Sequence, residues 1–149
     1  MLLYLDTSVF GGYFESEFEE WTVPLFGQLE QGKHRLLFSD IIDRELIDAP
    51  PRVRALAAKT VARRTTMLIA DQASIDLANL YLREKVVGKS SFADCMHIAL
   101  ATLHGADVLV SWNFKHIVNV ERILGYNAIN ARLGHCTLDI RSPREIVGQ

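Results

Sequence analysis

Leu2-Leu3-Tyr4-Leu5-Asp6 is the stretch of sequence that decides the fold class. Four consecutive apolar residues, with no polar residue alternating between them, are typical of a strand that is buried on both faces of a parallel sheet. Asp6 follows the run directly, so it is expected at the carboxyl end of that strand. Because ligands of open α/β sheets bind beyond the carboxyl ends of the strands, Asp6 is a candidate functional residue.

The remainder of the chain alternates between short apolar runs and helical patterns. Further strands are predicted at residues 35–38, 67–70, 107–110 and 137–140, and helices at 21–31, from Ser39 or Asp40 to 49, 52–66, 72–87, 92–104 and 116–124. Strands that alternate with helices in this way predict an α/β sandwich around a parallel sheet.

Length and composition limit the class of protein. The 149 residues predict a single domain over 1–149. A content of 49% hydrophobic and 23% charged residues excludes a disordered, collagen-like or disulfide-stapled chain. No apolar run approaches the roughly 18 residues of a membrane span, and no basic segment precedes the first apolar run, so we expect a cytoplasmic protein. The two cysteines, Cys95 and Cys136, are expected to be reduced and buried.

The distribution of charge along the chain is more informative than its total. The net charge of −2 argues against a protein that coats nucleic acid. Residues 1–50, however, contain three basic and ten acidic residues, whereas residues 51–149 contain thirteen basic and eight acidic ones. Such asymmetry is a recognised sign of an interaction surface.

Acidic and amide side chains occur where predicted strands end and helices begin. Asp6 ends the first strand, Glu45 lies on the helix after the second, Asp94 opens the apolar helix 92–104, and Asn113 lies just beyond strand 107–110. Carboxylates brought together at one edge of a sheet repel each other unless a cation neutralises them. Oxygen ligands without cysteine or histidine favour Mg²⁺ or Mn²⁺ over zinc. The set therefore predicts a metal-dependent phosphoryl-transfer or nuclease site.

Each member of this set also has a structural interpretation. Ser91 and Asp94 have the spacing of a helix capping box, and Asn113 suits a turn. Asp6 could simply mark a strand end, and a helical glutamate such as Glu45 is most often exposed to solvent. Individually these readings are the commoner ones, but the joint pattern favours function.

Other catalytic patterns are absent or incomplete in the sequence. Gly88-Lys89-Ser90 matches the end of a phosphate-binding loop, but Arg83 stands where its first glycine is needed. There is no zinc pattern of HExxH or CxxC type and no G-x-S-x-G nucleophile elbow. A haloacid-dehalogenase-like phosphatase needs a second Asp two positions after the first, and Ser8 occupies that place.

Four short motifs resemble, in the same order, those of the PIN-domain nucleases, and in particular the VapC-type toxins of type II toxin–antitoxin pairs. They are Leu5-Asp6-Thr7-Ser8-Val9, the segment from Ser39 to Glu45-Leu46, the helix that begins Phe92-Ala93-Asp94, and Leu109 to His116. The resemblance implies a three-layer α/β/α sandwich with a central parallel sheet of about four to five strands. It also implies Mg²⁺ or Mn²⁺ as cofactor and cleavage of single-stranded or structured RNA.

The resemblance assigns roles residue by residue. Asp6, Glu45 and Asp94 match the metal-binding acids. Asn113 stands where many members have a fourth Asp, which removes one negative charge and leaves a carbonyl oxygen. Ser8 is expected to orient Asp6 by hydrogen bonding. Further candidates for supporting the site or contacting substrate are Ser111, Lys115 and His116.

His97 and the assembly of the protein complete the predictions. His97 shares a helix face with Asp94, and we expect it to pack near the site as a hydrogen-bonded histidine rather than to contact phosphate. The resemblance also implies a homodimer and a small antitoxin as partner. Two other functions remain open, a catalytically weak or inactive PIN module that binds RNA or protein, and a stand-alone RNA-processing nuclease.

Overall fold

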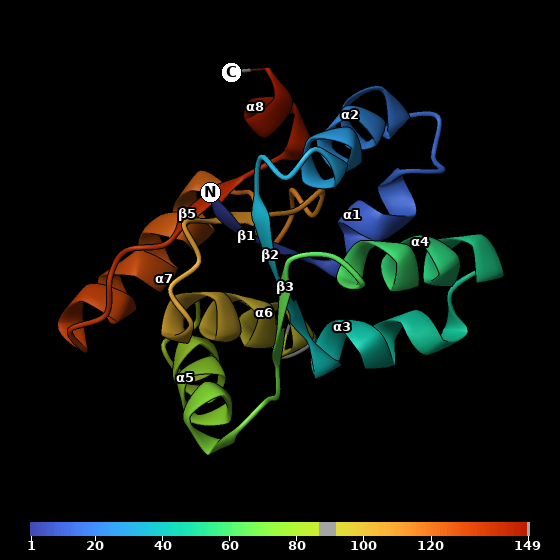
Figure 1. Cartoon of the computed structure of the whole chain (residues 1–149). Coiled ribbons are helices and arrows are strands. Elements are labelled where there is room, and N and C mark those ends of the chain that lie inside the picture. The colour runs from blue at the N-terminus through green and yellow to red at the C-terminus, as the bar shows by residue number, and fades with distance from the viewer. Residues whose placement is uncertain (87–91, 149) are drawn as a thin grey trace.

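A five-stranded parallel sheet forms the centre of the molecule (Figure 1). The computed structural model describes residues 1–86 and 92–148. The strand order is β3-β2-β1-β4-β5, and every neighbouring pair is parallel. The strands are β1 Leu2–Leu5, β2 Arg35–Ser39, β3 Thr65–Leu68, β4 Val108–Val110 and β5 Asp139–Arg141. The predicted parallel α/β fold is therefore confirmed, and the apolar run that predicted it is the central strand.

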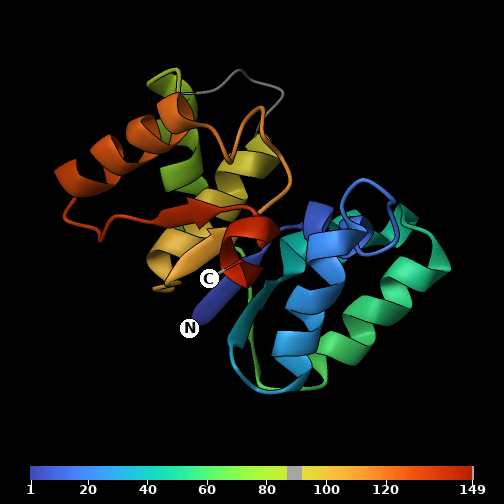
Figure 2. The ribbon, with the colours of Figure 1, turned by 90° about the horizontal axis from the view of Figure 1, so that it is seen from above.

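Helices cover both faces of the sheet in two separate groups (Figure 2). One group comprises α1 Thr7–Gly12, α2 Glu19–Glu30 and α4 Pro51–Val61, with α8 Pro143–Val147 packed on α2. The other comprises α5 Gln72–Arg83, α6 Phe92–Leu103 and α7 Val120–Arg132. This arrangement confirms the three-layer α/β/α sandwich, and it explains why Leu3, Tyr4 and Leu5 of the middle strand have no exposed surface.

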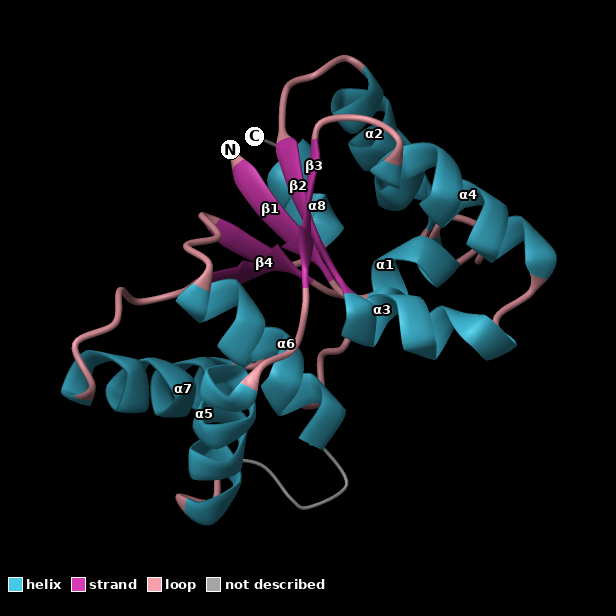
Figure 3. Cartoon of the chain, turned by 60° about the horizontal axis from the view of Figure 1, so that its bottom comes forward, coloured by secondary structure: helices cyan, strands magenta, loops and turns pink. Residues whose placement is uncertain are grey.

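The carboxyl ends of the central strands bring together segments that are distant in sequence. Strands β1 and β2 run toward the end of the sheet where α1 and α3, Asp40–Glu45, begin (Figure 3). The backbone N–H of Asp6 donates to the carbonyl of Val110, 3.1 Å away, so the residues after β1 and β4 are adjacent. Ser39 ends β2 and caps α3, its hydroxyl accepting from the N–H of Ile42 at 3.3 Å. A short 3-10 turn, Leu46–Asp48, follows α3.

Several element boundaries differ from those predicted. Helix α1 was not predicted, because its six residues end in Gly11-Gly12, which are poor helix formers. Gly12 is needed there, since a Cβ would lie 2.8 Å from the ring of Trp112. The helix predicted from 116 begins at Val120, where Asn119 caps it. The helix predicted to reach 66 ends at Val61, because the chain turns into β3.

Two remaining predictions concern the cysteines and the loop before α6. Cys95 is buried as expected, but the prediction for Cys136 is wrong because its side chain is exposed. The predicted loop at Gly88–Ser91, and with it the capping box of Ser91, lies outside the described residues. In the described part of the chain, no helix combines the length and apolar content needed to cross a membrane.

Candidate functional site

Asp6 is buried at the centre of the candidate site and is held by two serine hydroxyls. Ser8 donates to Asp6 Oδ1 at 2.5 Å, and Ser111 donates to Oδ2 at 2.6 Å. Both carboxylate oxygens are thus fixed, one from α1 and one from the end of β4. The predicted supporting roles of Ser8 and Ser111 agree with this geometry.

Glu45 and His97 form a hydrogen-bonded ion pair beside Asp6. His97 Nε2 lies 2.5 Å from Glu45 Oε1, which also accepts a bond from the hydroxyl of Thr7 at 3.0 Å. On its other side, His97 Nδ1 meets the hydroxyl of Tyr4 at 2.7 Å, and that hydroxyl contacts Ser39 Oγ at 2.8 Å. The prediction that His97 is a buried, hydrogen-bonded histidine is confirmed.

Opposite charges decide the protonation of this pair. Burial alone would lower the pKa of His97, but the hydrogen bond and charge of Glu45, with Asp6 and Asp94 beyond it, raise that pKa. Burial alone would raise the pKa of Glu45, but His97 and Thr7 lower it. Both shifts favour the charged forms, an imidazolium at His97 and a carboxylate at Glu45.

The environment of Asp6 and of Asp94 disfavours the charged form of each carboxyl group. Burial raises the pKa of Asp6, and the charge of Asp94 adds to it, while His97, Ser111 and Ser8 act the other way. Burial likewise raises the pKa of Asp94, and the charge of Glu45 adds to it, against His97, His116 and the amide of Asn113. Asp94 thus acts on Asp6, and Glu45 acts on Asp94, so Asp94 links the two other acids electrostatically.

Asn113 stabilises the turn after β4. Its Oδ1 accepts from the backbone N–H groups of Lys115 at 3.2 Å and His116 at 3.0 Å. Its own N–H donates to Ser111 Oγ at 2.9 Å. The carbonyl oxygen that could have been a metal ligand is thus engaged in the turn, and the side-chain amide is directed to Asp94. Lys115 is exposed, while His116 Nδ1 is buried and has no hydrogen-bond partner among the described residues.

The chemistry of these groups fits a hard divalent cation. Asp6, Glu45 and Asp94 present only oxygen donors, and with all three carboxylates ionised, as metal binding requires, and His97 protonated, their net charge would be −2. One divalent cation would balance that charge. Within residues 1–86 and 92–148, no group of three or more His, Cys, Asp or Glu side chains is already arranged to hold a metal ion. Glu45 Oε1 and both oxygens of Asp6 already take part in hydrogen bonds, so a cation would use the remaining lone pairs of these carboxylates together with Asp94.

The sequence did not indicate Tyr4 or Thr7 as part of the site. Tyr4 is one residue of an apolar strand, and only the fold places its hydroxyl between Ser39 and His97, which lie 35 and 93 positions away. Thr7 was included in the first motif without a role of its own. A polar atom at the end of a completely buried side chain was the available signal, because a buried hydroxyl requires a partner.

Comparisons with known proteins identify the fold. No family model and no curated protein matches the chain. Two solved structures are similar along nearly the whole length. One is VapBC2 from Rickettsia felis, bound to a DNA fragment from its promoter, with a TM-score of 0.58, 12% identity and coverage of 95% of this chain and 98% of that one. The other is FitAcB from Neisseria gonorrhoeae, with a TM-score of 0.56, 15% identity and coverage of 96% and 98%.

These findings establish a PIN-like fold and correct the family assignment. The motifs had identified the chain as a PIN-domain nuclease of the VapC toxin type. That identification is wrong as a statement of membership, because no family model matches and the structures compared above, VapBC2 and FitAcB, are only 12% and 15% identical to this chain. Likeness at this level carries the architecture alone, so function has to be inferred from the site.

Proposed function

We propose that the protein is a divalent-metal-dependent endoribonuclease that hydrolyses phosphodiester bonds in single-stranded or structured RNA. The observation that carries the proposal is the convergence of Asp6, Glu45 and Asp94 at the carboxyl ends of the central strands. The raised pKa values of both aspartates reflect burial first and then a neighbouring carboxylate, Asp94 for Asp6 and Glu45 for Asp94, and a bound cation would offset this repulsion. The PIN-like fold of VapBC2 and FitAcB is consistent with this proposal.

Different residues would bind the metal ion, orient its ligands and contact the substrate. Asp6 and Asp94 would hold the ion, assisted by the second oxygen of Glu45. When bound, Mg²⁺ or Mn²⁺ would activate the attacking water and stabilise charge on the phosphodiester. Ser8 and Ser111 hold the Asp6 carboxylate in one orientation, and Asn113 fixes the turn that carries Lys115. Lys115 is exposed beside the site and is suited to contact a substrate phosphate.

The charge of the site favours one ion rather than two. Asn113 contributes no negative charge, and the oxygen of its side chain is engaged by the N–H groups of Lys115 and His116. The remaining net charge of −2 matches a single divalent cation. Calorimetric titration with Mn²⁺ tests this inference, and we expect a stoichiometry close to one.

Cleavage of a defined RNA with and without Mn²⁺ tests the proposed activity. Replacing Asp94 by Asn keeps the shape of the side chain but removes its charge, and we expect cleavage to fall by about 100- to 1000-fold or more. Asp76→Asn is a matched control, because Asp76 lies on α5 and its side chain bonds to Gln72 at the surface. Undiminished cleavage by both Asp6→Asn and Asp94→Asn variants would refute the assignment.

A small antitoxin-like protein is the partner that the comparisons favour. Both similar structures bear the names of complexes, and the sequence motifs independently suggested such a partner. This part of the proposal would be supported by a reading frame for a small protein immediately upstream of the gene, and by co-purification of that small protein with this chain. The homodimer remains a prediction, which sedimentation of the purified chain would test.

An inactive binding module is the second candidate function, and Asn113 favours it. A site with one acid fewer, whose amide oxygen is engaged in a turn, offers a metal fewer ligands. An active nuclease should bind Mn²⁺ with a strong dependence on Asp6 and Asp94. A binding module should bind RNA or protein without that dependence.

A further inference from the structure

The ring of Phe114 is exposed, on the turn that follows β4 and carries Asn113. In the described part of the chain, two of the exposed large apolar side chains are aromatic, Phe92 and Phe114, and they are 38% and 51% exposed. Phe92 lies two residues before Asp94, and Phe114 directly follows Asn113. Exposed aromatic rings thus occur on the two segments that supply the end of the site, which is not expected for scattered surface residues.

These two rings differ in their surroundings. Phe92 lines an apolar pocket of about 540 Å³ together with Met96 and Ile75, so its side chain has apolar neighbours. Phe114 has one aromatic neighbour, Trp112, at a centroid distance of 6.0 Å and an interplanar angle of 63°. A tilted contact of this kind supports the ring and leaves about half of the residue accessible to a flat partner.

The loop that carries Phe114 is held by hydrogen bonds on both sides of the ring. Asn113 Oδ1 accepts from Lys115 and His116, and the backbone carbonyl of Asn113 accepts from the N–H groups of Ile117 and Val118. Trp112 is itself fixed, because its Nε1 donates to Thr22 Oγ1 at 2.9 Å and its ring stacks on Phe18 at 4.4 Å. A ring presented on such a support loses little conformational freedom when a ligand binds.

We infer that Phe114 is a stacking platform for an unpaired nucleobase next to the phosphate held at the acids. Proteins that bind single strands combine aromatic rings, on which bases stack, with cations that contact the backbone. Lys115 supplies the cation at the adjacent position, since it is exposed and takes part in none of the ion pairs among the described residues. This inference rests on the proposed ribonuclease function and adds a requirement, because a base can stack on Phe114 only if it is not paired.

The effect of Phe114→Leu on cleavage of a single-stranded RNA with one scissile bond tests the inference. Leucine keeps an apolar side chain but removes the aromatic face, so we expect KM to rise roughly 5- to 100-fold, with a much smaller change in kcat. Phe114→Trp should restore the wild-type KM. Leu133→Ala removes an exposed apolar side chain at the far end of α7 and should leave KM unchanged. An unchanged KM in Phe114→Leu would overturn the inference.

An abasic nucleotide placed beside the scissile bond provides a second, coupled test. If the base stacks on Phe114, the abasic RNA should raise KM for the wild-type protein and have no further effect on Phe114→Leu. Equal effects of the abasic site on both proteins would overturn the inference.

Binding by the Asp94→Asn variant separates this inference from the proposed activity. The test uses RNA that carries the fluorescent base 2-aminopurine at the same position. Binding of the Asp94→Asn variant should quench the fluorescence of this base, and binding of the Asp94→Asn/Phe114→Leu double variant should not. Absence of cleavage by the wild-type protein would refute the nuclease function, while the quenching experiment would still support or reject stacking.

Discussion

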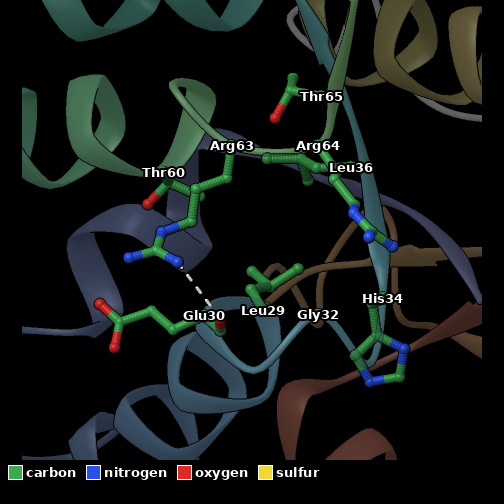
Figure 4. A pocket seen from close by; sticks show the side chains of 9 residues that line it. All are labelled: Leu29, Glu30, Gly32, His34, Leu36, Thr60, Arg63, Arg64 and Thr65. Carbon is green, nitrogen blue, oxygen red and sulfur yellow. Dashed lines mark hydrogen bonds between the residues drawn. The ribbon is translucent and has the colours of Figure 1, made fainter.

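The two ends of the central sheet differ in how their charges are satisfied. At the amino end, a hollow of about 100 Å³ is lined by charged and polar side chains, among them His34, Arg63 and Arg64 (Figure 4). Most of these groups bond to neighbours. Arg63 donates to the carbonyl of Glu30 at 3.2 Å, the Glu30 carboxylate pairs with Lys59 at 2.8 Å, and His34 Nε2 meets Gln28 Oε1 at 2.9 Å.

The carboxyl end has the opposite character. Asp6 is buried and Asp94 half-buried, whereas Arg63 and Arg64 are exposed, and burial raises the pKa of both aspartates. The small hollow at the amino end is therefore a poor guide to function, whereas the pocket of about 540 Å³ beside Phe92 is lined by Glu45 of the site. The better guide is charge that is held in place by hydrogen bonds and left without a counterion.

The largest expected effect is on stabilisation by metal, which should depend on an acid at the carboxyl end of the sheet and not on one at the amino end. At a Mn²⁺ concentration about 100 times the dissociation constant, bound metal would stabilise the wild-type protein by about 2.7 kcal/mol. We expect Asp6→Asn to lose this stabilisation. Glu30→Gln, a matched change at the amino end, should retain it. Thermal melts with and without Mn²⁺ measure both, and equal stabilisation of the two variants would contradict the comparison.

The two histidines provide the second contrast. His97→Gln removes the cation that pairs with buried Glu45 and leaves the Tyr4 hydroxyl short of a partner, so we expect a loss of about 1–3 kcal/mol in the free energy of unfolding. His34 bonds to the neutral Gln28, and His34→Gln should cost less than about 1 kcal/mol. Urea unfolding of both variants in metal-free buffer measures the difference. A larger loss of unfolding free energy in His34→Gln than in His97→Gln would contradict this prediction.

The pH dependence of stability should also originate at the carboxyl end. Because the pKa of Asp6 is raised on folding, the folded protein binds more protons than the unfolded chain above the ordinary aspartate pKa of about 3.9. Without metal, Asp6 therefore makes stability fall as pH rises toward its folded-state pKa. We expect Asp6→Asn to have a shallower decline than the wild-type protein in urea melts across this range. A steeper fall of stability with pH in Asp6→Asn than in the wild-type protein would contradict a raised pKa of Asp6.

The smallest effect is expected at the amino end. Arg64 is exposed and makes no ion pair among the described residues, so Arg64→Ala should change the free energy of unfolding by no more than about 0.5 kcal/mol. RNA cleavage should be unchanged. A loss of cleavage comparable to that of Asp94→Asn would show that the amino-end hollow takes part in the reaction.

The sequence predicted the sheet better than the short helices. Leu2–Leu5 could be recognised as a buried parallel strand, because an uninterrupted apolar run of that length has few alternatives. Helix α1 could not be recognised, because Gly11 and Gly12 oppose helix formation and only the proximity of Trp112 explains the need for Gly12. The local sequence pattern was therefore sufficient to predict strand β1, whereas helix α1 depends on tertiary packing that the sequence pattern does not reveal.

The acids of the site could be predicted, but their hydrogen-bond partners could not. Asp6 and Asp94 each stand at a predicted strand end or helix start, which is a local signal. The link from Tyr4 through His97 to Glu45 joins three separate elements, and no spacing in the sequence encodes it. The same holds for Asn113, whose residue type permits either a ligand or a turn and whose turn bonds appear only in the structure.

The hydrogen bond from Ser111 to Asp6 has a consequence for the time at which the site forms during synthesis. These residues are 105 positions apart, and β4 must pair with β1 before the bond can exist. Domains fold as their chain emerges from the ribosome, and β1, β2 and β3 can pair while β4 is still being made. The arrangement of Asp6 therefore remains incomplete until about three quarters of the chain, as far as Ser111, has emerged. A nascent chain therefore cannot complete this site until the ribosome has translated most of the message that encodes it.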